Sequence, residues 1–154
     1  MIATPLGRMQ AVVRDDALVS LRFVDAPPDT LPASTPHTPH PAVQAVHAFF
    51  KDPRQPIPLP LRPHGTPFQH AVWSALREIR TGETRSYSEI AHRIGRPRAI
   101  RAVAQAIARN PMHLLIPCHR VIGRDGQLTG FAAGLWRKAW LLEFERTGRT
   151  PVRQ

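Results

Sequence analysis

Cysteine is almost absent from this chain of 154 residues, in which Cys118 stands alone. A single cysteine can form no disulfide within the chain, so the protein has no need of an oxidising compartment. The sequence also lacks any apolar run that approaches the ~20 residues of a membrane-spanning helix. Its first residues, MIATPLGRMQ, show neither the basic start nor the long apolar stretch of a secretory signal. We therefore expect a cytoplasmic protein without a membrane partner.

Lysine is scarce as well, since Lys51 and Lys138 are the two lysines among 21 basic residues. The charge is uneven: residues 66–154 carry fifteen basic and six acidic side chains, whereas residues 1–65 carry six and five. Arginine presents a planar fork that suits phosphates and base edges, so this basic half predicts binding to nucleic acid. A genome biased towards arginine would explain the small number of lysines but not the uneven distribution.

Proline divides the chain at the same place, because twelve of the seventeen prolines lie in residues 1–65. We expect this part to form a small α/β subdomain with a short antiparallel sheet. The elements predicted are two strands at 8–14 and 17–24, a proline-rich loop at 25–41, a helix at 42–51 and an extended segment at 57–63. The histidines lack the partner cysteines and the spacing of a metal site, so no metal is expected.

Helix signals become clear from residue 66 onward, in a second predicted domain at 66–148. Thr66-Pro67-Phe68-Gln69 has the sequence of a capping box with proline at the first helical position. Apolar residues then recur on one helical face as far as Ile79. Ser86-Tyr87-Ser88-Glu89 is a second capping box, and Gly95 is placed to end the helix that it starts.

The second helix and a third one, joined by Gly95-Arg96-Pro97, resemble a helix-turn-helix. Pro97 would start the third helix, and its inward residues would be Ile100, Val103 and Ile107. The residues expected to face DNA are Arg98, Arg101, Ala102 and Gln105. The alternative is a solvated face of an ordinary helical bundle, and the uneven charge favours DNA.

The segment after Cys118 contains a turn signal, because the Asp125-Gly126 pair stands between Val121-Ile122 and Leu128. We expect a β-hairpin here that forms a wing, with Arg124 facing DNA. A final helix at 133–146 would close the core, and residues 149–154 would form a loose tail.

Pro117-Cys118-His119-Arg120 carries the chemistry. The thiolate is the nucleophilic form of cysteine and positive neighbours favour it, while His119 could accept the thiol proton. The alternative is a buried cysteine that only packs. A metal site is not supported, since Cys118 and His119 supply two ligands where three or four are needed.

The segment PCHRVIGRDGQLTGFAAGL resembles the active-site signature of the O6-alkylguanine-DNA alkyltransferases (methylated-DNA–protein-cysteine methyltransferases). The same family is matched in order and spacing, over about residues 65–145, by GTPFQHAVWSALREI, GETRSYSEIA, AIRAVAQAIARNPMHLLIPCHRV and RKAWLLEFE. The resemblance implies an α-rich winged helix-turn-helix C-terminal domain and an RNase H-like N-terminal α/β subdomain. It also implies irreversible transfer of an alkyl group from O6-alkylguanine, and also from O4-alkylthymine, in double-stranded DNA by a monomer without a cofactor.

The resemblance assigns catalytic roles to five residues. Cys118 would accept the alkyl group, His119 would act as its base through a water, and Glu145 would orient the imidazole. Tyr87 would assist base flipping and donate a proton towards N3 of guanine. Asn110 would link the recognition helix to the active-site loop.

The resemblance also assigns contacts with DNA and with the flipped base. Arg101 would fill the gap that the flipped nucleotide leaves, and Ala102 would allow close approach in the minor groove. The substrate pocket would comprise Pro117, Val121, Ala132, Ala133 and His113. Ala133 replaces a glycine that is usual in the family, so its methyl group is expected to restrict bulky O6 substituents.

Two other functions remain open from the sequence. An alkyltransferase-like protein would bind the lesion without removing it, but relatives of that kind replace the cysteine that is present here as Cys118. A plain winged-helix regulator would explain the charge and the helices. It would not explain the combination of Cys118, His119 and Glu145.

Overall fold

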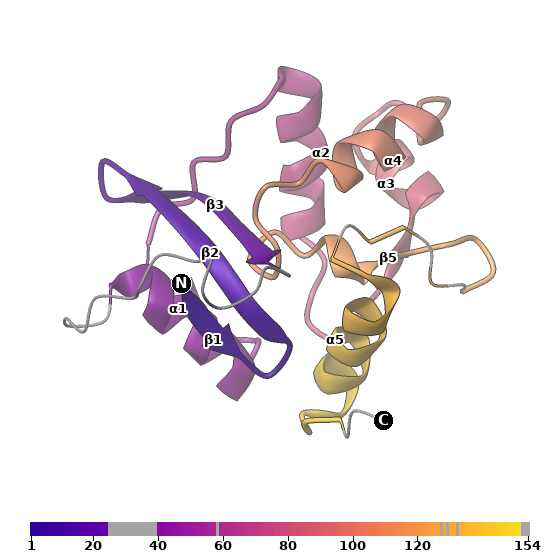
Figure 1. Ribbon diagram of the computed structural model, residues 1–154. Helices are drawn as coiled ribbons and strands as arrows, with labels where there is room; N and C mark the ends of the chain where they lie inside the picture. Colours follow the sequence, from indigo (N-terminus) through magenta and orange to yellow (C-terminus); the bar gives the residue numbers. More distant parts are fainter. Residues whose placement is uncertain (25–39, 58, 127, 129, 132, 152–154) are drawn as a thin grey trace. The chain divides into compact units, whose positions relative to one another are not determined.

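The computed structural model describes residues 1–24, 40–57, 59–126, 128, 130–131 and 133–151. These fall into two compact units, Met1–His64 and Gly65–Gln154 (Figure 1). Ala132, most of the predicted loop at 25–41 and half of the predicted tail at 149–154 lie outside the described residues.

The N-terminal unit is a three-stranded antiparallel sheet with one helix. Its elements are β1 (Ile2–Thr4), β2 (Gly7–Arg14), β3 (Ala17–Val24) and α1 (Pro41–Lys51), with strand order β1-β2-β3. Asp15 and Asp16 have φ of 51° and 63°, the left-handed conformation that a tight two-residue hairpin turn needs. The two predicted strands and the helix are confirmed, whereas β1 was not predicted.

The extended segment predicted at 57–63 pairs with β3 at a single point. Leu18 donates its backbone N–H to Pro60 O at 2.9 Å, and Arg62 donates to Leu18 O at 2.8 Å. Leu18 and Leu61 form an isolated parallel bridge there. The predicted extended segment is confirmed, and its prolines limit the pairing because proline can donate no ladder hydrogen bond.

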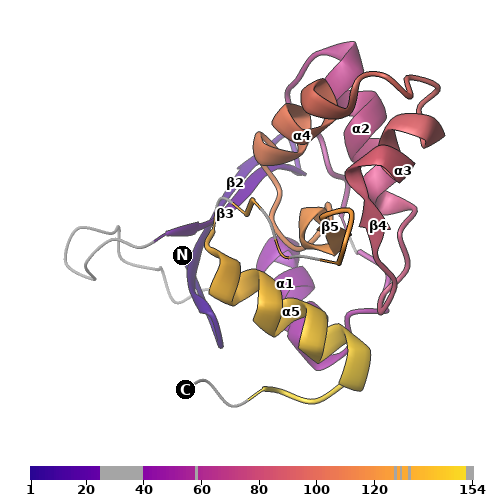
Figure 2. The same cartoon turned by 90° about the vertical axis from the view of Figure 1, so that its right-hand side faces the viewer.

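The C-terminal unit is mainly helical (Figure 2). Its elements are α2 (Pro67–Arg77), β4 (Arg85–Ser86), α3 (Tyr87–Arg93), α4 (Ile100–Ala108), the 3₁₀ turn η2 (Cys118–Arg120), β5 (Val121–Ile122) and α5 (Leu135–Thr147). Thr66 and Ser86 form the two predicted capping boxes. Helices α2, α3 and α4 pack on one another, and Trp73 Nε1 donates to Ala106 O at 2.9 Å between α2 and α4.

The prediction for the start of α4 was wrong by about one turn. Pro97 and Arg98 lie in a turn, and α4 begins only at Ile100. Ile100 was expected to face inward, yet it is 42% exposed. It stands at the first helical position, a turn before Val103, the first buried residue of α4, so its side chain extends beyond the packed part of the helix.

The wing also differs from the predicted hairpin. A turn does form, because Gly126 donates its N–H to Gly123 O at 3.0 Å. However, β5 pairs in parallel with β4, through Arg85 with Val121 and Ser86 with Ile122, and Leu128 lies outside any strand. The partner strand therefore comes from the start of α3, some 35 residues earlier, which no local turn signal can indicate.

The final helix begins at Leu135, two residues later than predicted. Gly148 ends α5 with φ of 72°, and its N–H bonds to Phe144 O. Three charged residues of α5 are buried, namely Arg137, Lys138 and Glu145. Among the helices that the structure describes, none has the length and hydropathy to cross a membrane.

Candidate active site

The chain approaches Cys118 through a buried segment that the Asn110 side chain braces. Asn110 Nδ2 donates to Ile116 O at 2.8 Å and to Met112 O at 3.3 Å, while its Oδ1 accepts from Met112 N at 2.9 Å. Leu114 has φ of 72°, a conformation that is strained for a branched side chain. One amide thus holds a strained loop between the end of α4 and the cysteine.

A tight turn at Pro117 then sets the direction of the thiol. Cys118 N donates to Ile116 O at 2.7 Å across Pro117, whose φ of −79° and ψ of 66° are those of an inverse γ-turn. Arg120 N donates to Pro117 O at 3.0 Å and closes η2. Cys118 is 5% exposed, so its sulfur lies in a mostly dry position at the start of η2.

Burial dominates the ionisation of Cys118. It raises the thiol pKa to about 11, although hydrogen bonding by Asn110 and the positive charge of Lys138 act in the opposite direction. A positive neighbour does favour the thiolate, as expected, but burial has the larger effect on the thiol pKa. At neutral pH the thiol is protonated, so a reaction at sulfur needs a group that takes the proton.

The His119 side chain, completely buried, meets Glu145 of α5. His119 Nε2 lies 2.9 Å from Glu145 Oε2. A carboxylate can only accept, so Nε2 donates the hydrogen of this bond, and Nδ1 is the ring nitrogen that could accept a proton. The structure therefore brings together the base and the orienting carboxylate that the resemblance implies, from positions 26 residues apart.

Arg120 completes this group, and sequence reasoning missed its role. Its Nε donates to Glu145 Oε1 at 2.8 Å and its Nη2 to Oε2 at 2.7 Å, a bidentate fork. Its Nη1 donates to Ile79 O after α2, and its Nη2 reaches Thr81 Oγ1 at 3.1 Å. The only signal in the sequence was the position of Arg120 beside His119, which does not indicate that Arg120 pairs with Glu145.

The pKa of Glu145 shows that its two neighbours, His119 and Arg120, together outweigh the effect of burial. Burial alone would raise it, but His119 and Arg120 lower it to about 2. Glu145 is thus ionised at all physiological pH values. An ionised carboxylate can stabilise an imidazolium at His119, which a base needs when it accepts a proton.

The other predicted pocket residues that the structure describes are all buried. Val121 and Pro117 are buried beside η2, and His113 is 6% exposed with its ring 5.8 Å from that of Phe131. Ala133 is buried and its carbonyl accepts from Arg137 Nη1 at 2.8 Å.

Tyr87 is half-buried at the first position of α3. A Cβ added to Gly130, which has φ of 45°, would lie 3.6 Å from Tyr87 Oη. The phenol therefore lies against the backbone of the segment that leads into α5, close to a residue with no side chain.

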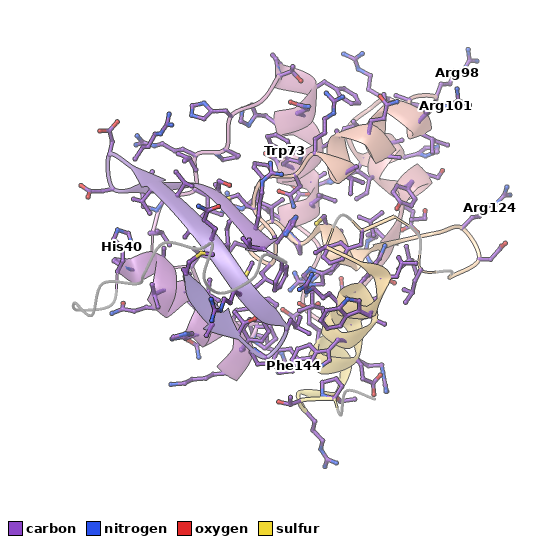
Figure 3. The ribbon with its side chains drawn as sticks, viewed as in Figure 1. His40, Trp73, Arg98, Arg101, Arg124 and Phe144 are labelled. Carbon is purple, nitrogen blue, oxygen red and sulfur yellow. The ribbon has the colours of Figure 1, made fainter. Side chains whose placement is uncertain are left out.

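The residues predicted to face DNA are all exposed. Arg101, Ala102 and Gln105 lie on α4, Arg98 lies in the turn before it, and Arg124 follows β5. In Figure 3 the three arginines extend outward from the C-terminal unit. His119, Arg120 and Glu145 are buried, so the exposed arginines and the buried ion pair differ in their access to solvent.

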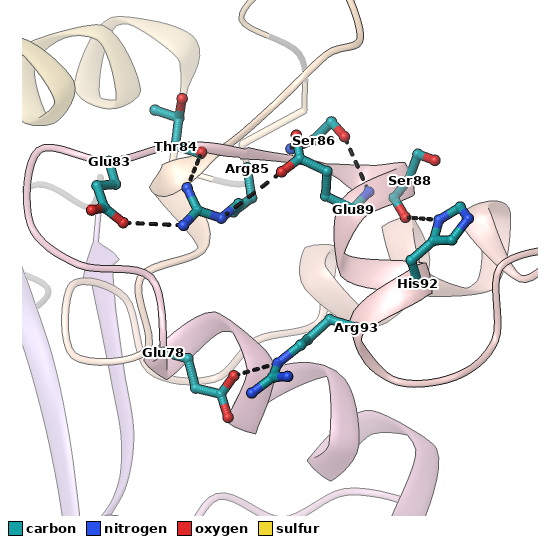
Figure 4. A network of polar contacts seen from close by, with 9 residues as sticks. All are labelled: Glu78, Glu83, Thr84, Arg85, Ser86, Ser88, Glu89, His92 and Arg93. Atoms are coloured by element: carbon teal, nitrogen blue, oxygen red, sulfur yellow. Dashed lines mark hydrogen bonds and ion pairs between the residues drawn. The ribbon is translucent and has the colours of Figure 1, made fainter.

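A second charged region lies between α2 and α3 (Figure 4). Arg93 Nε lies 2.7 Å from Glu78 Oε2, while Arg85 lies 3.1 Å from Glu83 and 3.8 Å from Glu89. Glu78, Arg85, Glu89 and Arg93 border a hollow of about 490 Å³. Its exposed charges are paired with one another, so it offers no excess charge to a nucleic acid.

The described residues contain no cluster of three or more histidine, cysteine, aspartate or glutamate side chains that could hold a metal ion.

Comparisons with known proteins place these features in a family. Residues 67–147 match the family model described as "6-O-methylguanine DNA methyltransferase, DNA binding domain". A methylated-DNA–protein-cysteine methyltransferase of Methanosarcina barkeri is 54% identical over 104 residues, which cover 68% of this chain and 66% of that protein, slightly less than two thirds of its length. The enzyme of the same name from Mycolicibacterium paratuberculosis is 43% identical over 94% of this chain and 90% of its own.

Solved structures agree with the sequence relatives. OGT of Mycobacterium tuberculosis in complex with DNA is 39% identical, with a TM-score of 0.81 over 94% of this chain and 89% of that one. An O6-methylguanine DNA methyltransferase from Methanococcus jannaschii shares the fold, with a TM-score of 0.70 at 23% identity. The predicted fold, a small antiparallel sheet followed by a helical region, is confirmed. This chain belongs to the 6-O-methylguanine DNA methyltransferase family.

Proposed function

We propose that this protein repairs DNA by transferring an alkyl group from O6-alkylguanine to the Cys118 sulfur. The single observation that carries the proposal is the buried arrangement of Cys118 beside His119, whose Nε2 lies 2.9 Å from an ionised Glu145. These residues would supply the nucleophile, the base and the orienting carboxylate of covalent catalysis.

The bond changes balance without an added reagent. The Cys118 sulfur attacks the alkyl carbon, an S–C bond forms, and the C–O6 bond breaks with its electron pair passing to the guanine. His119 takes the thiol proton, through a water in the role that the resemblance gives it, and guanine is restored by a net gain of one proton. All atoms come from the thiol and the substrate, so no cofactor is needed. The thioether cannot be reversed by these groups, and each molecule acts once.

The raised thiol pKa explains the need for the base. With a pKa of about 11, Cys118 holds its proton at pH 7, and attack requires its removal at the moment of reaction. Glu145 and Arg120 fix the carboxylate, and the carboxylate fixes the His119 ring. Tyr87 is the proposed proton donor towards N3 of guanine, while Asn110 holds the loop that presents the thiol.

Duplex DNA is the proposed partner because the O6-alkyl carbon cannot meet a buried thiol while its base is stacked. Arg101 would occupy the space of the flipped nucleotide, with Ala102 next to it permitting close approach in the minor groove. The other proposed DNA contacts are Arg98, Gln105 and Arg124, all exposed. A monomer in the cytoplasm is proposed, since one chain carries all of these groups and a reduced thiol is kept there.

The pocket is proposed to be selective for small alkyl groups. The substrate would lie against Pro117, Val121, Ala132, Ala133 and His113. Ala133 is buried, so its methyl group takes space where a glycine would leave it. We expect slower transfer of benzyl than of methyl groups, and equal rates would contradict this part of the proposal. Binding of the lesion without repair is the weaker alternative, because Cys118 is present.

Intact-protein mass spectrometry tests the proposal directly. After mixing with an oligonucleotide duplex that contains O6-methylguanine, the protein should gain the mass of one methylene, in a 1:1 ratio. Cys118→Ala should gain none, and Arg101→Ala should react more slowly on duplex DNA but normally with free O6-benzylguanine. Absence of any mass gain in the wild-type protein would refute the transfer activity.

A further inference from the structure

Arg137 is an arginine at a place where two effects oppose a positive charge. It is the third residue of α5 and is 3% exposed. Burial of a guanidinium group is unfavourable unless polar partners compensate, and the positive end of the helix dipole lies at the same turn. The first turn of α5, which the structure describes in full, carries no acidic residue. The contacts of Arg137 must therefore offset both effects.

Two contacts of Arg137 reach back to the chain before the helix. Its Nη1 donates to the carbonyl oxygen of Ala133 at 2.8 Å. Its guanidinium carbon lies 4.6 Å from the centre of the Trp136 ring, which is within the range of a cation–π interaction. The same ring closely approaches Gly134, where an added Cβ would lie 3.2 Å from it. Gly134 in turn donates its N–H to Phe131 O at 2.8 Å and closes a turn. Arg137 and Trp136 thus fix the end of this turn.

The turn that Arg137 holds lies against groups that are proposed to act in the reaction. The Phe131 ring centre lies 5.8 Å from that of His113, which belongs to the braced loop that presents the thiol. One residue before the turn, Gly130 lies close to the Tyr87 hydroxyl group. The chain before α5 is therefore in contact with the proposed proton donor and with the loop of the nucleophile, and Arg137 fixes it at its far end.

We propose that Arg137 is a positioning residue that sets which O6-alkyl groups the site accepts. The inference rests on the proposed alkyl transfer and on Ala133 as a wall of its substrate pocket. Because Arg137 holds the Ala133 carbonyl, the Ala133 methyl group cannot move aside to admit a bulky substituent. The methyl group supplies the steric limit, and Arg137 makes that limit rigid. Arg137 acts through Ala133 and takes no part in bond making.

The test compares transfer from two duplexes that are identical except for O6-methylguanine in one and O6-benzylguanine in the other. Arg137→Met removes the hydrogen bond to Ala133 O and keeps an unbranched side chain. Arg146→Met is the matched control, because Arg146 lies exposed on the same helix and pairs with Glu143. The readout is the ratio of the benzyl rate to the methyl rate, since a general loss of folded protein lowers both rates equally and leaves their ratio unchanged.

We expect this ratio to rise about fivefold in Arg137→Met, the factor that corresponds to one buried hydrogen bond of about 1 kcal/mol. Arg146→Met should keep the wild-type ratio. Ala133→Gly should raise the ratio by itself, and Arg137→Met added to it should change the ratio no further, because no methyl group remains to be held. Hydrogen exchange of the Gly134 amide, measured without DNA, should be faster in Arg137→Met, since this N–H closes the turn.

Three results would overturn the inference: an unchanged ratio in Arg137→Met, an equal rise when Arg137→Met is added to Ala133→Gly, or unchanged hydrogen exchange at Gly134. If Arg137→Met does not fold, Trp136→Leu removes the ring beside the guanidinium at a position that is 39% exposed. It should raise the ratio in the same direction, and an unchanged ratio there would also overturn the inference.

The two measurements separate this inference from the proposed function. A wild-type protein that transfers neither group refutes the alkyl transfer, and the inference with it. A wild-type protein that transfers both groups, with a ratio that Arg137→Met leaves unchanged, refutes the inference alone. Hydrogen exchange needs neither DNA nor transfer, so it tests the hold of Arg137 on the turn by itself.

Discussion

Two glutamate–arginine pairs in the C-terminal unit have the same contact distance and very different surroundings. Arg120 Nη2 lies 2.7 Å from Glu145 Oε2, and Arg93 Nε lies 2.7 Å from Glu78 Oε2. The Glu145 side chain is 1% exposed and that of Glu78 is 56% exposed. Water screens the exposed Arg93–Glu78 pair, called the outer pair below (Figure 4). It is excluded from the buried Arg120–Glu145 pair, called the inner pair. The same contact distance therefore corresponds to different interaction energies. Burial, and not distance, distinguishes the pair that contacts His119 from the pair on the surface.

The largest effect is expected when the inner carboxylate loses its charge. Glu145→Gln leaves the Arg120 guanidinium buried without its anion, and removal of one partner from a buried pair typically costs about 3–5 kcal/mol. Urea unfolding at pH 7 should show a loss of that order, and alkyl transfer should be abolished or slowed severely. A variant as stable and as active as the wild type would refute the role given to this pair.

Acid should remove the contribution of the Arg120–Glu145 pair to stability. The folded pKa of Glu145 is about 2, below its ordinary value of 4.5, so its contribution is present above pH 4.5 and is lost as the pH falls towards 2. A difference of that size corresponds to about 3 kcal/mol of unfolding free energy. Urea unfolding at pH 5 and at pH 2.5 measures the loss.

The Glu145→Gln variant is the control for this pH dependence, because it has no carboxyl group at this position. Its unfolding free energy should fall less between the same two pH values. If both proteins lose equal stability, groups other than Glu145 account for the acid sensitivity.

A smaller effect is expected when the inner pair keeps both charges but loses the bidentate hydrogen bonds of the guanidinium group. Arg120→Lys retains a cation but cannot donate to both oxygens of Glu145 and to Ile79 O together. Loss of buried hydrogen bonds typically costs about 1–3 kcal/mol. Transfer should slow, since the carboxylate is less well fixed, and unchanged kinetics would show that His119 needs no such support.

The smallest effect is expected at the outer pair. Glu78→Gln removes the partner of Arg93, but both side chains are more than half exposed and water replaces the contact. The urea midpoint and the transfer rate should equal those of the wild type. A clear loss in either measurement would break the comparison, because it would give the hollow between α2 and α3 a function.

Local signals account for the part of the structure that was predictable. The capping boxes at Thr66 and Ser86 bond within three residues, so their residue types determine the helix starts. Cys118, His119 and Glu145 could be named because their motifs resemble a family. The contact between His119 and Glu145 then followed from that resemblance, since no spacing rule links residues 26 apart.

Two of the misses share a cause, which is pairing between distant segments. The partner of β5 is β4, and the partner of Arg120 is Glu145 on α5. The sequence next to β5 and to Arg120 indicates neither of these partners. The apolar composition of the last helix likewise concealed Lys138, because a lysine in a helix is ordinarily a surface residue and its burial depends on what packs against it.

The spacing of Leu141 and Glu145, both buried on α5, has a consequence for how this protein can change through insertions and deletions. One residue added between them would rotate Glu145 by about 100° relative to the buried face that Leu141 marks, and its carboxylate could then no longer meet His119 and Arg120. Substitution of the exposed residues Ala139 and Glu143 leaves the relation intact. The helical register of α5 is therefore a stricter requirement than the identity of many of its residues, and a change of chain length there would disable the site while preserving every active-site side chain.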